Sequence, residues 1–189
     1  SGSGAIDISN LIGNTTPLST VAINTTASPG GAGNEATGNI SIAGVGKANL
    51  SAGGTAAGAT FSAGNTDTNL ITLDGDDYVF AGDATFTAKS GNTIDNKGAS
   101  GTITDYKTLG TTDITFAGGT LYIQDATTGV NIATSNGAVT INSIDGDHDE
   151  TVEIAAGSGA VSVGRIGGTN SSGEGIKSVA ITSSNSTGI

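Results

Sequence analysis

The chain has 189 residues, of which 32 are Gly, 17 are Asp or Glu and only 6 are Lys or Arg. The formal net charge of −11 disfavours binding to nucleic acid or to an anionic membrane surface. The lack of cysteine excludes disulfides, thiol catalysis and cysteine-based zinc sites. No window has the apolar spacing of an amphipathic helix, and no apolar run approaches the roughly 20 residues of a membrane helix. We therefore expect no helical bundle, no doubly wound α/β enzyme and no membrane insertion.

Short runs of alternating β-branched or aromatic residues recur along the chain, and Gly, Asn, Asp or Ser closes each run. Alternation with a period of two buries one face of a strand and exposes the other. Turn residues roughly every 8–12 positions are typical of an all-β domain. The predicted strands lie near residues 5–8, 39–42, 69–73, 78–80, 113–116, 120–123, 130–132, 139–141, 152–154, 161–163 and 179–181.

We expect one continuous domain with three parts. Residues 1–26 are a β-repeat that echoes the C-terminal segment, because residues 2–8 (GSGAIDI) resemble residues 157–163 (GSGAVSV). Residues 27–65 are irregular and rich in Gly and Ala, and residues 66–189 are the main β-strand repeat region. The echo is explained either by the periodicity of coils or by a longer tandem repeat, and we favour the tandem repeat.

A shorter repeat indicates how the strands are arranged. Residues 130–144 (VNIATSNGAVTINSI) and 152–166 (VEIAAGSGAVSVGRI) have the same residue at seven of fifteen positions. A fixed period of about 22 residues with short strands is typical of a β-solenoid, in which each coil stacks on the previous one. This interpretation requires Val139 to lie directly beside Val161 on a parallel strand.

Two segments favour an alternative fold, the antiparallel β-sandwich. Residues 78–89, around Gly82 and Asp83, and residues 113–124, around Gly118 and Gly119, have the pattern of β-hairpins. Such a sandwich suits a subunit of an S-layer or extracellular filament that assembles by strand exchange between subunits. A flagellin outer domain is a third possibility, although it requires an excised domain because the long terminal helices of that family are missing.

Two acidic turns are the candidate metal sites. One contains Asp74, Asp76 and Asp77, and the other contains Asp145, Asp147 and Asp149. Carboxylates clustered on a Gly-kinked loop can supply the oxygen ligands that Ca²⁺ requires, and residues 75–79 resemble half of the nonapeptide of calcium-binding β-rolls. The competing interpretation, which we favour, is that these aspartates cap backbone N–H groups in turns. Calcium is the one candidate cofactor.

We predict no enzymatic activity. His148 is the single histidine, and no serine lies in the Gly-x-Ser-x-Gly pattern of a hydrolase. The acidic residues near 145–149 and Arg165 could be drawn as the site of a polysaccharide-cleaving β-helix. However, the seven aromatic residues lie within or beside strand-like runs, where packing explains them without a sugar-binding platform.

Residues 157–166 (GSGAVSVGRI), followed after a Gly/Thr/Asn turn by residues 179–182 (VAIT), resemble the β-strand repeats of large bacterial surface exoproteins. These include filamentous-haemagglutinin-like adhesins, autotransporter passengers and S-layer-like proteins. The resemblance covers about residues 110–189 and 1–26. It implies a right-handed parallel β-helix, an extracellular location at the cell surface, and a role as stalk, coat or filament. The partners it implies are neighbouring repeats or identical subunits, and host or cell-surface glycans.

Overall fold

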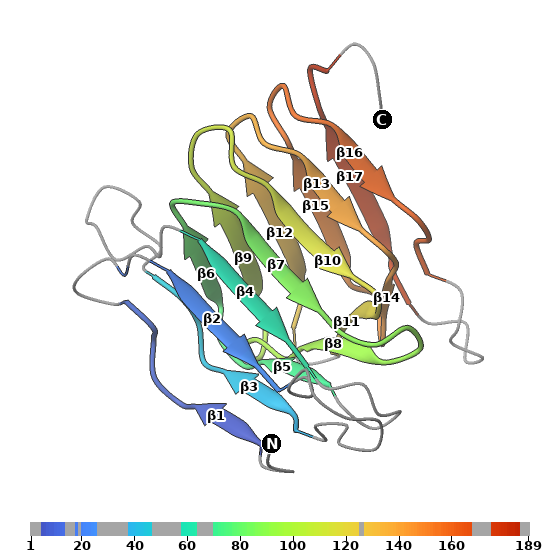
Figure 1. The fold of residues 1–189 in the computed structure, drawn as a ribbon. Helices are drawn as coiled ribbons and strands as arrows, with labels where there is room; N and C mark the ends of the chain where they lie inside the picture. Colours follow the sequence, from blue (N-terminus) through green and yellow to red (C-terminus); the bar gives the residue numbers. More distant parts are fainter. Residues whose placement is uncertain are drawn as a thin grey trace.

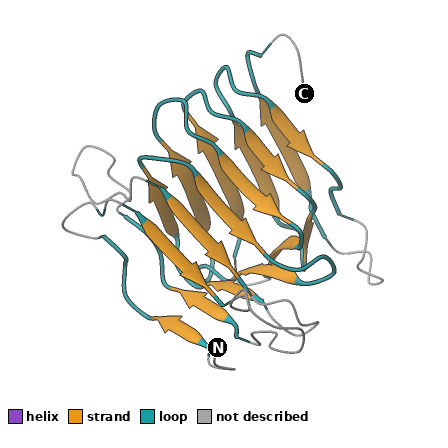
Figure 2. Ribbon diagram, in the orientation of Figure 1, coloured by secondary structure: helices purple, strands orange, loops and turns teal. Residues whose placement is uncertain are grey.

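The computed structural model describes residues 5–13, 18, 20–25, 38–46, 58–63, 70–124, 127–167 and 175–185, in which all regular structure is β-strand (Figures 1 and 2). The first sheet has, in spatial order, β1 (Ile6–Ile8), β3 (Ile40–Ile42), β5 (Ile71–Leu73), β8 (Thr93–Asn96), β11 (Thr120–Ile123) and β14 (Ile144–Gly146). The second sheet has β2 (Val21–Asn24), β4 (Ala59–Ser62), β7 (Ala84–Thr87), β10 (Ile114–Ala117), β13 (Val139–Ile141) and β16 (Val161–Val163). The third sheet has β6 (Asp77–Phe80), β9 (Ile103–Thr108), β12 (Gly129–Thr134), β15 (Thr151–Ala155) and β17 (Ser178–Thr182).

The chain visits the three sheets in a fixed rotation. From β6 onward, successive strands lie in the third, second and first sheets, and this order repeats through β16. Each strand from β6 to β13 pairs in parallel with the strand three elements later, as β7 does with β10 and β10 with β13. The described ends of the chain therefore lie at opposite ends of a stack of β-helix-like coils (Figure 1). The all-β prediction is confirmed.

The predicted stacking of residues 130–144 on residues 152–166 is also confirmed. Val139 of β13 pairs with Val161 of β16 in a parallel ladder, and Val130 of β12 pairs with Val152 of β15. The uniform coil length of about 22 residues is wrong for earlier coils. Paired positions are 30 residues apart for Ala84 and Ile114, because longer connections can be inserted at the corners without changing the ladders.

The antiparallel β-sandwich is wrong, since every pairing between described strands is parallel. The two predicted hairpins are corners of the coil: β6 and β7 lie in different sheets, and so do β10 and β11. Gly118, at the second corner, has φ of 77°. A strand–Gly–Gly–strand pattern fits a hairpin and a coil corner equally well locally, and only the pairing partners distinguish them.

The echo between residues 2–8 and 157–163 does not correspond to equivalent places in the winding. Residues 6–8 form β1 of the first sheet, whereas residues 161–163 form β16 of the second sheet. Within the segment 27–65, residues 40–42 and 59–62 form strands β3 and β4. Residues 26–37, 47–57, 64 and 65 lie outside the described residues.

On each sheet, a column of inward-facing side chains stacks in register from coil to coil through the described chain, and we call these three the core columns. The first-sheet column contains Ile6, Ile40, Ile71, Ile94, Leu121, Ile144 and Ile166. The second-sheet column contains Ile23, Phe61, Phe86, Phe116, Ile141 and Val163. The third-sheet column contains Ile12, Val45, Tyr78, Tyr106, Ile132, Ile154 and Ile181. Every member is apolar or aromatic.

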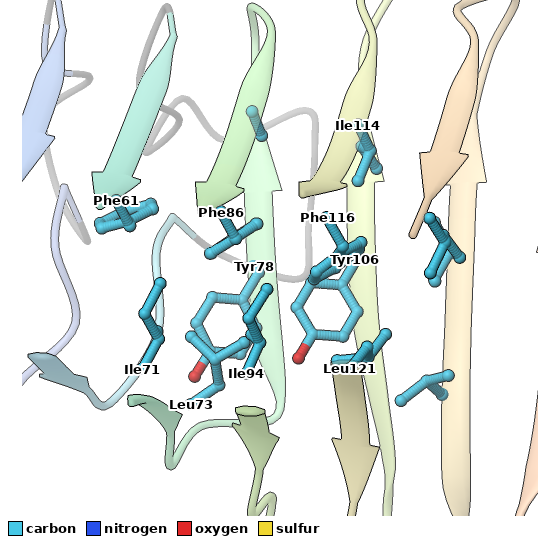
Figure 3. Close-up of a cluster of buried hydrophobic side chains, with 14 of the residues drawn as sticks. Phe61, Ile71, Leu73, Tyr78, Phe86, Ile94, Tyr106, Ile114, Phe116 and Leu121 are labelled. Carbon is cyan, nitrogen blue, oxygen red and sulfur yellow. The ribbon is translucent and has the colours of Figure 1, made fainter. Parts of the chain in front are cut away.

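The widest side chains lie at the centre of the stack (Figure 3). Phe61 and Phe86 stack with ring centroids 5.0 Å apart, and so do Tyr78 and Tyr106. Parallel strands lie about 4.8 Å apart, so in-register rings meet at the distance that favours stacking. Across the core, Tyr106 meets Phe116 edge to face at 5.2 Å. The aromatic residues therefore join the second and third sheets as well as successive coils.

Candidate functional site

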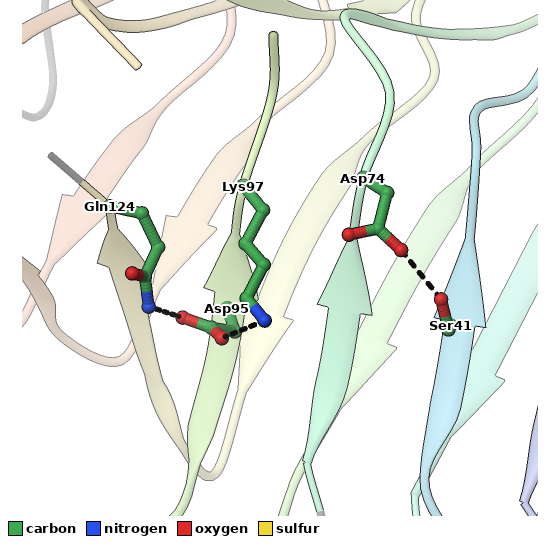
Figure 4. Close-up of polar contacts among 5 residues, drawn as sticks. All are labelled: Ser41, Asp74, Asp95, Lys97 and Gln124. Carbon is green, nitrogen blue, oxygen red and sulfur yellow. Dashed lines mark hydrogen bonds and ion pairs between the residues drawn. The ribbon is translucent and has the colours of Figure 1, made fainter. Parts of the chain in front are cut away.

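The outward face of the first sheet carries the most extended row of polar side chains on registered positions. We call it the first-sheet polar row, and it consists of Asp7, Ser41, Thr72, Asp95, Tyr122 and Asp145. The alternation of each strand places these residues opposite the core columns. A second set, just past the ends of the strands, contains Asp74, Lys97 and Gln124 (Figure 4).

Contacts in this region run from one coil to the next. The Ser41 hydroxyl donates to Asp74 Oδ2 at 2.6 Å, which links β3 to the end of β5. Gln124 Nε2 donates to Asp95 Oδ1 at 2.6 Å, and Lys97 Nζ lies 3.7 Å from Asp95 Oδ2 (Figure 4). Asp74 and Asp95 are thus each engaged by a neighbouring polar side chain.

The first acidic turn sends its three carboxylates in different directions. Asp74 accepts the Ser41 hydroxyl, as described above. Asp76 Oδ1 accepts the Ala99 N–H at 2.6 Å and the Thr102 hydroxyl at 2.9 Å. Asp77 lies on β6 in register with Asp105 of β9. Partial burial, followed by the neighbouring Asp105 carboxylate, raises the pKa of Asp77 above its ordinary value, while Lys107 acts in the opposite direction.

The second acidic turn is equally divided. Asp145 is 1 % exposed, and its Oδ1 accepts the Gly146 N–H at 3.0 Å. Asp147 Oδ1 accepts the Tyr122 hydroxyl at 3.2 Å. Asp149 has φ of 60° and lies 3.8 Å from Lys177 Nζ, with both side chains exposed. Burial, and then Asp147, raises the pKa of Tyr122.

Glu150 organises this turn from within. Its side chain is 1 % exposed, and its Oε1 accepts the backbone N–H of Asp147 at 3.2 Å and that of His148 at 2.6 Å. Its Oε2 is buried without a hydrogen-bond partner among the described residues and faces Gly146, where an added Cβ would lie 2.2 Å away. The sequence pattern singled out the aspartates and missed Glu150, because alternation alone does not show that a carboxylate folds back onto its own turn.

The structure does not unite the six predicted metal-site aspartates. Both turns lie at the corner between the first and third sheets, but β5 and β14 are three strands apart in the first sheet, which corresponds to about 14 Å. Within the described ranges, no group of three or more His, Asp or Glu is close enough to hold a metal ion. Asp145 accepts a backbone N–H within its own turn, as the competing interpretation expects, whereas Asp74, Asp76 and Asp147 accept groups from neighbouring coils.

No family model, curated protein or solved structure matches this chain. The chemistry of the polar rows therefore rests on their own geometry. In the part of the chain that the structure describes, no helix is long and apolar enough to span a bilayer.

The same inter-coil arrangement recurs on the other sheets. Asn131 Nδ2 of β12 donates to Asp105 Oδ1 of β9 at 2.8 Å, and Lys107 Nζ lies 2.6 Å from Asp105 Oδ2. At the corner before β10, Asp113 Oδ1 accepts the Ala138 N–H one coil later at 2.7 Å. Sequence reasoning missed Asp95, Asp105 and Asp113 because they stand alone in the sequence. They could have been found only after the coils were placed in register, because each then occupies an outward-facing or corner position.

His148 and Arg165, the residues considered for catalysis, both take part in backbone hydrogen bonds that hold the fold together. The His148 backbone N–H is bonded to Glu150, and the Arg165 backbone carbonyl accepts the Ile144 N–H in the ladder between coils. Most of the side-chain hydrogen bonds to carboxylates come from a hydroxyl or amide group one coil away. The Asp95–Lys97 and Asp105–Lys107 ion pairs lie within one coil. Chemically, the hydrogen bonds join adjacent coils.

Proposed function

We propose that this chain is an extracellular structural and adhesive module of a large bacterial surface protein or filament, without catalysis. We further propose that its coils form a right-handed parallel β-helix, since strand–crossover–strand connections between parallel strands have this hand in nearly all proteins. The observation that carries the proposal is the continuity of the three core columns from the first described coil to the last.

The side-chain contacts between coils support a mechanical role. In parallel sheets the backbone ladder resists separation of each coil from the next, and hydrogen bonds such as Asp105–Asn131 add to it on the outward face. The net charge of −11 favours solubility outside the cell. Outward-facing hydroxyl groups suit hydrated contact with host or cell-surface glycans, and the unpaired edges of the end strands suit neighbouring repeats.

The location is tested on intact cells of the source organism. An antibody raised against the 189-residue chain is used for immunogold labelling, and a second sample is treated with protease before lysis. Labelling on the cell surface and loss of the protein on treatment of intact cells are the expected results. A protein that is protected until the cells are lysed contradicts the extracellular assignment, with a cytosolic protein as the control for cell integrity.

A further inference from the structure

The two ends of the coil stack expose most of the large apolar side chains that the core does not cover. Leu11 and Leu18 of the first coil are 39 % and 42 % exposed, and Ile166 and Val179 of the last coil are each 40 % exposed. Among the exposed large apolar residues of the described ranges, only Ile103 lies elsewhere. The edges of β1, β2, β16 and β17 have no further strand beyond them within the described residues, and such edges are templates for pairing with another chain.

The two ends match each other on the first and third sheets. The first-sheet column begins at Ile6 and ends at Ile166, and the second-sheet column begins at Ile23 and ends at Val163. The third-sheet column begins at Ile12 and ends at Ile181. If the last coil of one molecule lies on the first coil of another, so that Ile166 meets Ile6 and Ile181 meets Ile12, the first-sheet and third-sheet columns continue with an aliphatic residue on an aliphatic residue. The second-sheet column has six registered positions against seven in each of the other two, so Val163 and Ile23 are separated by one strand position at this junction.

The charges of the two ends are complementary, although the molecule as a whole is strongly acidic. The described part of the last coil, residues 161–167 and 175–185, contains Arg165 and Lys177 and no carboxylate side chain. The described part of the first coil, residues 5–13, 18 and 20–25, contains Asp7 and no cation. When Ile166 is placed against Ile6 of a second molecule, Arg165 and that molecule's Asp7 occupy diagonal positions, which lie about 7–8 Å apart on adjacent strands.

From this match we propose that the C-terminal end of one molecule binds the N-terminal end of a second copy, head to tail. The interface is formed by Ile166 and β17 of one copy and by β1 and Ile12 of the other. Because the two surfaces differ, each bound copy leaves one of each surface open, and association continues into a linear filament. The inference rests on the proposed role as a stacking module and names its partner.

The test uses the whole 189-residue chain in analytical ultracentrifugation and negative-stain microscopy over a range of concentrations. We expect concentration-dependent linear assemblies of constant width. Arg165→Asp and Asp7→Arg should each raise the dissociation constant by about tenfold or more, since each places like charges at the junction. An equimolar mixture of the two variants should assemble again, because every junction between unlike variants pairs opposite charges.

Matched substitutions away from the ends separate this surface from general effects. Val179→Lys should block assembly, whereas Ile103→Lys, at an exposed apolar residue in the middle of the stack, should leave it unchanged. Equal urea midpoints of the variants show that the fold is intact. A chain that stays monomeric, or assemblies insensitive to Arg165→Asp and Val179→Lys, would overturn the proposal. A monomeric chain that labels the surface of intact cells would contradict this inference alone and leave the proposed function standing.

Discussion

The ring of Phe86 stacks on the ring of Phe116 in the next coil, with centroids 5.0 Å apart and ring planes inclined by 9°. Phe86 also stacks on Phe61 of the preceding coil and meets Tyr78 and Tyr106 edge to face. A register shift of one residue would turn these rings to the solvent face. The phenylalanine stack therefore fixes the alignment of three successive coils.

Replacing Phe86 by Ala should be among the most destabilising single changes in the chain. The side chain is fully buried, so the substitution removes apolar contacts and leaves a cavity between two rings. We expect a loss of about 3–5 kcal/mol in the free energy of unfolding, measured by urea denaturation. The control is Thr85→Val on the outward face of the same strand, which should change stability by less than about 1 kcal/mol. Similar losses for both variants would contradict the assigned facing of β7.

Substitution of Ala for Gly at two corners of the coil separates the cost of backbone strain from the cost of close packing. Gly118 and Gly110 have φ of 77° and 68°, a region that favours glycine. An added Cβ would lie 2.0 Å from the Ala88 carbonyl oxygen at Gly118, but would meet nothing within 4 Å at Gly110. Gly110→Ala should therefore cost about 1 kcal/mol from strain alone. Gly118→Ala should cost about 1–3 kcal/mol more because the coil below must move, and equal urea midpoints would contradict the close approach.

Local sequence patterns predicted the elements that depend on neighbouring residues. The alternation of β-branched residues located most of the strands, and the 22-residue repeat placed Val139 beside Val161 because both coils have equal length. The aromatic stack was not predicted, since Phe61, Phe86 and Phe116 are separated by unequal intervals of 25 and 30 residues. Coils that differ in length conceal their register from any search for a fixed period.

The acidic turns of the candidate site show in the same way that local sequence does not predict contacts between coils. Asp74, Asp76 and Asp77 are close in sequence, but a strand begins within the group and alternation turns its side chains apart. Their partners Ser41, Ala99 and Thr102 come from other parts of the winding. Sequence proximity therefore suggested a shared ligand set, whereas the three-dimensional positions depend on which coil lies beside each residue.

The buried pair of Tyr106 and Asn96 should behave as a unit. The Tyr106 hydroxyl donates to Asn96 Oδ1 at 2.5 Å, and Asn96 Nδ2 has no hydrogen-bond partner in the described part of the chain. Tyr106→Phe should cost about 1–3 kcal/mol because it leaves a buried carbonyl oxygen unpaired. Adding Asn96→Leu should recover much of that loss, since Leu73 and Ile123 occupy the registered positions on either side. A double-mutant cycle measures this recovery, and purely additive losses would contradict the coupling.

Removal of divalent cations tests the calcium hypothesis directly. The six candidate aspartates separate into different contacts, and Asp76 and Asp147 already accept donors from the protein. We therefore expect the melting temperature to be the same in EDTA and in millimolar Ca²⁺. Asp74→Asn serves as a comparison, because it retains an acceptor for Ser41 and should change stability little. A rise in melting temperature with Ca²⁺ that Asp147→Asn abolishes would establish a site that this geometry does not show.

Alkaline pH should destabilise the fold through its two buried tyrosines. Burial raises the pKa of Tyr78 and of Tyr106 well above the ordinary value of about 10. Above that pH the unfolded chain loses phenolic protons that the folded chain keeps, so the folded state binds more protons and stability falls as the pH rises. Below about pH 9 both states keep their phenolic protons, and the two tyrosines contribute their full stabilisation to the folded state.

Each tyrosine should add a slope of about 1.4 kcal/mol per pH unit, or about 2.7 for both. Urea midpoints measured between pH 8 and pH 12 test this expectation. Tyr106→Phe should reduce the slope of the free energy of unfolding against pH by the contribution of one tyrosine, although the substitution lowers stability at neutral pH. Tyr122→Phe is the control, since that ring is partly exposed on the outward face and should alter the slope less. A Tyr106→Phe variant with an unchanged slope would show that this hydroxyl is not held protonated in the core.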